Sequence, residues 1–143
     1  MDLELLREGS RFTLYALKIG DSVDKFLAAL KNTDHAEFAR IMRRLEQLAE
    51  NGASKRKTEF NDLGNGLYEA KSTGGSRVIF FYDRNHLVLC AHAFLKKTQK
   101  TPRGILEAAV QRHKQYLKIR QAGASAFTIH VPHNQKNPTR FPQ

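Results

Sequence analysis

Several features are scarce in this 143-residue chain, and each scarcity excludes a class of protein. Its one cysteine, Cys90, excludes an intrachain disulfide and a zinc cluster of several thiolates. Because Cys90 lies in the apolar run LVLCAHAF, we interpret it as a small buried residue rather than a nucleophile. No apolar run reaches the roughly 18 residues of a membrane span, and the acidic start MDLELLREGS lacks the hydrophobic segment of a secretory signal. These absences predict a cytoplasmic protein with no membrane association.

Acidic residues are also scarce, and the resulting charge is unevenly spread. The chain has 24 Lys and Arg against 14 Asp and Glu, a net charge of +10. Residues 1–54 hold 8 basic against 9 acidic residues, residues 55–103 hold 10 against 4, and residues 104–143 hold 6 against 1. The natural complement of such a surface is nucleic acid or an acidic protein. With 41% hydrophobic residues, the chain has enough apolar material for one globular domain.

The first third of the chain predicts one strand followed by two amphipathic helices. Residues 11–18 alternate loosely between apolar and polar residues, as a strand does. Asp21 or Ser22 is suited to cap a helix, because apolar residues recur at helical spacing after it. Asp34 is suited to cap a second helix, and Gly52 fits the position just after its end.

The middle of the chain predicts an antiparallel meander. After a short lead-in over residues 58–63, strands are expected at 67–72, 76–82 and 86–94, separated by turn sequences rich in Gly and Asn. In the second strand, Arg77 shares a face with two apolar residues. An arginine there must emerge at the sheet margin, pair with a carboxylate or line a site.

A cationic loop and a helix follow the meander. The loop spans residues 96–102, and the helix is expected to begin near Pro102 and Arg103, because proline is favoured in the first helical turn. Residues 125–131 are compatible with one short strand. We therefore divide the chain into a compact domain, residues 1–121, and a basic C-terminal extension, residues 122–143. The extension serves either a partner-specific contact or a strand packed onto the sheet edge.

Two segments of the sequence resemble those of a known protein family. DLGNGLYEAKSTGGSRVIFFYD, followed by AHAFLKKTQKTPRGILEAA, resembles the RelE/ParE toxin superfamily and, within it, the phage-derived HigB-like branch. The resemblance covers roughly residues 11–120, and FLKKTQKTP is its most specific part. It implies an α+β, RelE-like fold: a small antiparallel sheet of about four strands packed against two N-terminal helices and one C-terminal helix.

The resemblance also implies an activity. Members are mostly toxins of type II toxin–antitoxin pairs, which enter the ribosome and cut mRNA by 2′-OH attack on the adjacent phosphate, without a metal or small-molecule cofactor. The expected partners are a cognate antitoxin, the ribosome and mRNA. Two alternatives stay open: a non-enzymatic, ParE-like inhibitor of DNA gyrase, and a phage-derived binding protein that has lost nuclease activity.

Five residues are predicted to form the catalytic set: Arg77, Lys71, Lys96, Lys97 and His92. The resemblance places Arg77 against the scissile phosphate, and the alternative is an ion pair with Glu69 or Asp83. Lys71 stands where most relatives carry arginine, so it keeps the charge but not the bidentate fork. His92 is either a proton-transfer group or a partly buried histidine with a backbone partner.

A second set of cations is predicted to bind RNA phosphates. These residues are Lys55, Arg56, Lys57, Lys100 and Arg103. Relatives often carry a tyrosine near the position of residues 104–107, but here the nearest one, Tyr116, is about three turns further along. That departure leaves His92 or a lysine to take the tyrosine's role, or indicates slow or absent cleavage.

Overall fold

The computed structural model describes residues 1–84, 86–96 and 101–132. The helices of this part are α1 (Val23–Thr33), α2 (His35–Asn51), α3 (Arg103–Arg120) and the short 3-10 helix η1 (Ala124–Ala126). Its strands are β1 (Asp2–Glu8), β2 (Thr13–Leu17), β3 (Phe60–Gly64), β4 (Leu67–Lys71), β5 (Ser76–Asp83), β6 (Leu87–Leu95) and β7 (Thr128–His130).

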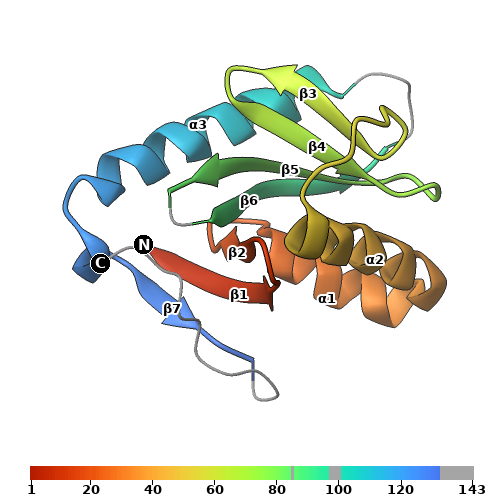
Figure 1. Cartoon of the computed structure of the whole chain (residues 1–143), viewed down its shortest axis with the longest axis horizontal. Helices are drawn as coiled ribbons and strands as arrows, with labels where there is room; N and C mark the ends of the chain where they lie inside the picture. Colours follow the sequence, from red (N-terminus) through yellow and green to blue (C-terminus); the bar gives the residue numbers. More distant parts are fainter. Residues whose placement is uncertain (85, 97–100, 133–143) are drawn as a thin grey trace.

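The described strands form one mixed sheet of seven strands, in the order β3-β4-β5-β6-β2-β1-β7 (Figure 1). Strands β4, β5 and β6 pair antiparallel, which confirms the predicted meander. The pairs β2–β6 and β1–β7 are parallel. The prediction of a small antiparallel sheet of about four strands is therefore wrong. So is the grouping of two helices at the N-terminus, because α1 and α2 lie between β2 and β3 in the chain.

The error arose at the two ends of the chain and at β3, which the sequence interpretation treated as a lead-in to the meander. The segment Asp2–Glu8 contains four charged residues, yet Leu3 and Leu5 alternate with them and are buried, as in a strand with one covered face. Near the other end, β7 pairs with β1 and joins the described part of the predicted extension to the sheet. The division of the chain at residue 121 stays a prediction.

The sheet has helices on both faces. Apolar residues of α1 and α2 pack with Leu14, Val78 and Phe80, whereas α3 packs with Tyr15 and Phe81. Because neighbouring strand residues point to opposite faces, this alternation divides the core into two layers. In Figure 1, α3 lies on one side of the sheet and the α1–α2 pair on the other.

Cys90 belongs to the layer under α1 and α2. Its side chain is fully buried, and burial raises the pKa of its thiol to about 12. The prediction of a buried, non-nucleophilic cysteine is confirmed.

The ends of α2 follow the sequence signals. The Asp34 carboxylate accepts a hydrogen bond of 3.1 Å from the backbone N–H of Glu37, which confirms the predicted N-cap. Gly52 follows the helix with φ +81°, a conformation that favours glycine.

The first turn of α2 also holds a buried carboxylate. Glu37 is 2% exposed and accepts hydrogen bonds from the hydroxyls of Ser72 and Ser76 in the β4–β5 turn. It also accepts from the Ser76 backbone N–H at 3.0 Å and from Arg40 Nε at 2.7 Å. The turn passes so close that a Cβ on Gly74 would lie 1.8 Å from a Glu37 oxygen. Glu37 thereby ties α2 to the turn.

Because these bonds stabilise the charged form of Glu37, we expect the protein to lose stability at low pH. Burial raises the pKa of Glu37, but the bonds from Ser72, Ser76 and Arg40 outweigh burial and lower the pKa from 4.5 to about 2. A depressed folded-state pKa contributes stability that is complete above pH 4.5 and is lost as the pH falls toward 2. We expect Glu37→Gln to lower the free energy of unfolding by about 3 kcal/mol at pH 7, with the difference shrinking below pH 4.5.

Urea unfolding curves at pH 7 and pH 3 would measure this difference. Glu46→Gln is the control, because Glu46 lies on the same helix with a side chain that is 54% exposed. An equal loss of unfolding free energy for Glu37→Gln at pH 7 and pH 3 would contradict this link between stability and the ionisation of Glu37.

Candidate functional site

Two of the predicted catalytic residues face each other across neighbouring strands. Lys71 ends β4 and is the cross-strand partner of Arg77 on β5. Both lie on the sheet face that carries Ile79 and Phe81, the face covered by α3. The Lys71 ammonium donates a 3.0 Å hydrogen bond to the backbone carbonyl of Lys57.

Arg77 is held by the turn that precedes it. One terminal nitrogen of its guanidinium donates to the carbonyls of Ser72 and Ser76, each at 2.9 Å, and its side chain is 13% exposed. Its Nε lies 3.9 Å from a Glu69 oxygen, beyond hydrogen-bond range. Within the described residues this Nε is buried without a hydrogen-bond partner. This Nε is therefore a donor that a bound water or ligand can satisfy.

Lys96 joins this pair at the end of β6. Its backbone N–H donates to the Gly75 carbonyl at 2.7 Å, and Gly75 has φ +103°. Burial, followed by the charges of Arg77 and Lys96, lowers the pKa of Lys71. We call Lys71, Arg77 and Lys96 the cation cluster, because the charges of Arg77 and Lys96 both act on Lys71.

A buried carboxylate lies beside the cation cluster. Glu69, two residues before Lys71 on β4, is 1% exposed. It accepts a 2.8 Å hydrogen bond from the hydroxyl of Thr101, immediately before α3. The end of the FLKKTQKTP segment is therefore anchored to the sheet beside Arg77. Of the two acids considered as partners of Arg77, Glu69 is the neighbour, because Asp83 instead accepts from Tyr116.

His92 has different surroundings. Its Nδ1 accepts a 3.0 Å hydrogen bond from the Ala93 N–H, the backbone partner considered in the sequence. Burial and the charge of Arg112 lower its pKa, and the negative charge of Asp21 partly offsets them. The charged neighbours of His92 thus differ from those of Lys71. Tyr116 is buried on α3 and donates a 2.6 Å hydrogen bond to Asp83, so it is not an exposed catalytic hydroxyl.

The predicted RNA-binding residues are dispersed. Lys55, Arg56 and Lys57 are exposed on the loop after α2. Lys55 and Lys57 line a groove of about 430 Å³ that also contains Tyr68 and Tyr82. These tyrosine rings, with centroids 5.3 Å apart, offer an aromatic surface beside two cations. Lys100 lies outside the described residues, as does Lys97 of the predicted catalytic set. Arg103 is exposed and paired with Glu107 at 2.9 Å.

The described residues contain neither a metal-binding cluster nor a membrane-spanning helix. Residues 1–84, 86–96 and 101–132 contain no group of three or more His, Cys, Asp or Glu placed to hold a metal ion. In the same part of the chain, no helix is long and apolar enough to cross a membrane.

The cation cluster has a definite chemical capacity. Arginine and lysine donors stabilise a phosphate that gains negative charge, most strongly where water is partly excluded. A lysine with a lowered pKa is neutral more often at physiological pH and so can accept a proton. One guanidinium, one such lysine and a third cation therefore meet the requirements of a phosphoryl-transfer site.

Comparison with known families shows what the chain is related to. The family model described as phage derived protein Gp49-like (DUF891) matches residues 28–114, more than half of the chain. The chain belongs to the Gp49-like family. This family belongs to the RelE/ParE-like toxin superfamily, as the resemblance implied. A search of curated proteins found no match.

The Gp49-like match locates the candidate site within the family domain. Residues 28–114 run from α1 into α3 and include the whole cation cluster, Glu69 and Thr101. Strands β1, β2 and β7 lie outside the match. Of these three strands, β1 was missed in the sequence, whereas segments at the positions of β2 and β7 were expected to form strands.

The sequence interpretation also missed a group of residues on α2. Glu37, Arg40, Arg43 and Arg44 were not among the predicted site residues. Their signal was present, because the three arginines stand at i, i+3 and i+4 and so share one side of a helix. Their contact with the β4–β5 turn depends on tertiary structure.

Arg77 is expected to stabilise the fold as well as any ligand. Replacing it with alanine removes two hydrogen bonds to carbonyls and leaves buried Glu69 without its nearest cation. We expect Arg77→Ala to lower the free energy of unfolding by about 2–3 kcal/mol. Adding Glu69→Gln should restore part of this loss, because it removes the uncompensated buried charge.

Denaturant unfolding of the two variants would test this, with Arg84→Ala as the control because Arg84 is exposed at the other end of β5. A loss below about 0.5 kcal/mol for Arg77→Ala would show that its contacts are structurally dispensable.

Proposed function

We propose that this Gp49-like protein is a HigB-like toxin of a type II toxin–antitoxin pair, acting in the cytoplasm as a ribosome-dependent mRNA endonuclease. The observation that carries the proposal is the cation cluster, in which Lys71, Arg77 and Lys96 lie together and the buried Nε of Arg77 has no hydrogen-bond partner among the described residues. Membership of a toxin superfamily supports the same conclusion. The proposed partners are mRNA on the ribosome and a neutralising antitoxin.

The proposed reaction uses the ribose as nucleophile. The 2′-oxygen attacks the adjacent phosphorus, its proton passes to Lys71, and the bond from phosphorus to the 5′-oxygen breaks. The leaving oxygen takes a proton from the Lys96 ammonium. Arg77 neutralises the charge that accumulates on the phosphorane. The products are a 2′,3′-cyclic phosphate and a 5′-hydroxyl end, and the step consumes no metal or cofactor.

The first experiment maps new mRNA ends after brief induction. We expect 5′-hydroxyl ends inside translated frames that are absent when translation is blocked. Lys96→Ala and Arg77→Ala should abolish these ends at equal protein level, because each removes a charge that stabilises the transition state. Arg84→Ala should leave them unchanged. Lys96→Ala keeps the test valid if Arg77→Ala proves unstable.

Each contrary result identifies a different function. Growth arrest with intact mRNA and DNA damage would replace the nuclease with a gyrase inhibitor. Absence of arrest, with folded protein present, would leave a binding module without toxin activity. Ends that persist in both variants would refute the assignment of the cluster.

The lowered pKa of Lys71 predicts a pH dependence. A general base must be deprotonated, so the rate of cleavage should rise with pH and level off at a pH below the usual lysine pKa of 10.5. Lys71→Arg keeps the positive charge but cannot give up its proton, and we expect it to slow cleavage by about 100-fold or more. Single-turnover cleavage on purified ribosomes between pH 6 and 9 would show this. A variant that retains the rate and the pH profile would exclude Lys71 as the base.

A further inference from the structure

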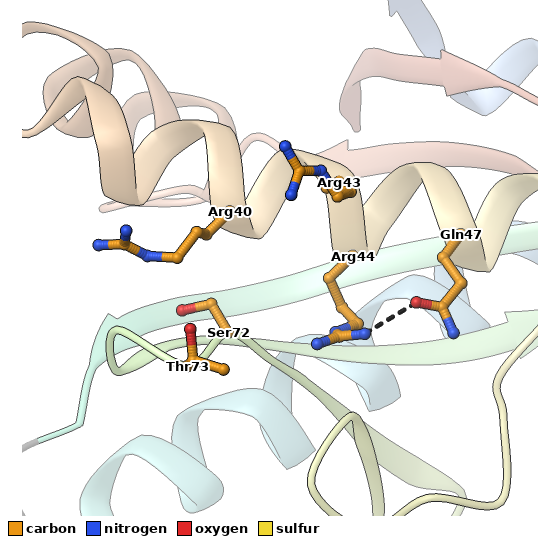
Figure 2. A pocket seen from close by; sticks show the side chains of 6 residues that line it. All are labelled: Arg40, Arg43, Arg44, Gln47, Ser72 and Thr73. Carbon is orange, nitrogen blue, oxygen red and sulfur yellow. Dashed lines mark hydrogen bonds between the residues drawn. The ribbon is translucent and has the colours of Figure 1, made fainter.

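A second basic site lies between α2 and the β4–β5 turn. It is a pocket of about 220 Å³, and no apolar side chain lines it. Its lining residues are Arg40, Arg43, Arg44, Gln47, Ser72 and Thr73. Figure 2 shows Arg44 reaching from the helix toward the turn, with Arg40 one helical turn away along α2.

Two of the three arginines are oriented by hydrogen bonds that leave donors available. Arg40 Nε donates to Glu37 at 2.7 Å. Arg44 Nε donates to the Lys71 carbonyl at 2.8 Å, and one of its terminal nitrogens donates to Gln47 at 2.8 Å. Within the described residues, both terminal nitrogens of Arg40 and the other terminal nitrogen of Arg44 have no such bond. A guanidinium held through its Nε presents its remaining donors in a fixed plane, which suits oxyanion recognition.

The third arginine has no structural partner. In the part of the chain that the structure describes, Arg43 is exposed and makes no hydrogen bond or ion pair. Like charges at i, i+3 and i+4 destabilise a helix. Glu37 and Glu59 offset the charges of Arg40 and Arg44, the latter at 3.3 Å, so one positive charge is left uncompensated. No hydrogen bond or ion pair of the described residues uses this charge to stabilise the fold.

The pocket adjoins the cation cluster through two residues. Arg44 bonds the carbonyl of Lys71 from the pocket side, and Arg77 bonds the carbonyl of Ser72 from the α3 side. The pocket and the cluster therefore lie on either side of the same chain segment. Thr73 and Gly74 of this segment are exposed, so a polyanion bound along the turn can contact both.

We propose that the arginine pocket binds a backbone phosphate of the RNA strand whose scissile phosphate lies at the cation cluster. The inference rests on the proposed function and extends it by a second phosphate subsite. The exposed hydroxyl-bearing Thr73 and the free guanidinium nitrogens supply donors for phosphate oxygens. RNA is favoured over an acidic peptide because the pocket adjoins the cation cluster, where the proposed function places an RNA strand.

The test measures RNA binding separately from cleavage. The probe is a fluorescent 12-nucleotide RNA with 2′-O-methyl riboses, which cannot undergo 2′-OH attack, titrated with purified protein at 50, 100 and 200 mM KCl. We expect Arg43→Gln to raise the Kd about threefold or more and to reduce the slope of log Kd against log salt concentration by about 1. Arg84→Gln, the same substitution at an exposed arginine at the opposite end of β5, should leave both unchanged.

The outcomes separate this inference from the proposed function. Equal Kd values for Arg43→Gln and Arg84→Gln, or absence of binding by the wild type, would overturn the pocket assignment. So would an Arg43-dependent affinity for a glutamate-rich peptide without one for RNA. Arg43-dependent RNA binding by a protein that creates no mRNA ends in cells would support the pocket and refute the nuclease.

Discussion

The position of the candidate site depends on one buried carboxylate. Glu37 accepts hydrogen bonds from both serines that flank the β4–β5 turn, and Gly74 lets the chain pass beside it. The carbonyls of Ser72 and Ser76, in turn, hold Arg77. A single acidic residue on α2 thus sets the geometry of a cation on the opposite face of the sheet. Charge-assisted hydrogen bonds in a partly dry interior are strong enough for this role.

Much of the central part of the chain could be predicted from local signals. Asp34 and Gly52 mark the ends of α2 because capping chemistry requires few residue types. Strands β4 to β6 follow alternating apolar residues and Gly-rich turns. Strand β1 was missed because four of its seven residues are charged. The sequence interpretation therefore treated this segment as an acidic start and overlooked the leucines that alternate with the charges. The parallel β1–β7 pair joins residues more than 120 positions apart, and no local pattern encodes such a pairing.

The site was predicted in part for similar reasons. Lys71, Arg77 and Lys96 were identified from motif positions, and the strand register brings them together. His92 was considered because imidazole titrates near neutrality, and the structure gives it the backbone partner of the alternative interpretation, with Arg112 nearby. The pocket residues of α2 were missed because a charged helical face usually contacts water. Only the tertiary contact between α2 and the β4–β5 turn distinguishes this face from an ordinary solvated one.

The buried thiol of Cys90, the one cysteine of the chain, can be used to detect local opening of the fold. Thiol reagents attack thiolate, and a fully buried group with a pKa of about 12 presents none to solvent. The labelling rate of the native protein therefore measures how often β6 opens between its two neighbours, β5 and β2. A cysteine introduced at an exposed position would accept a dye alone. Fluorescence could then follow the labelled protein without removal of the native thiol.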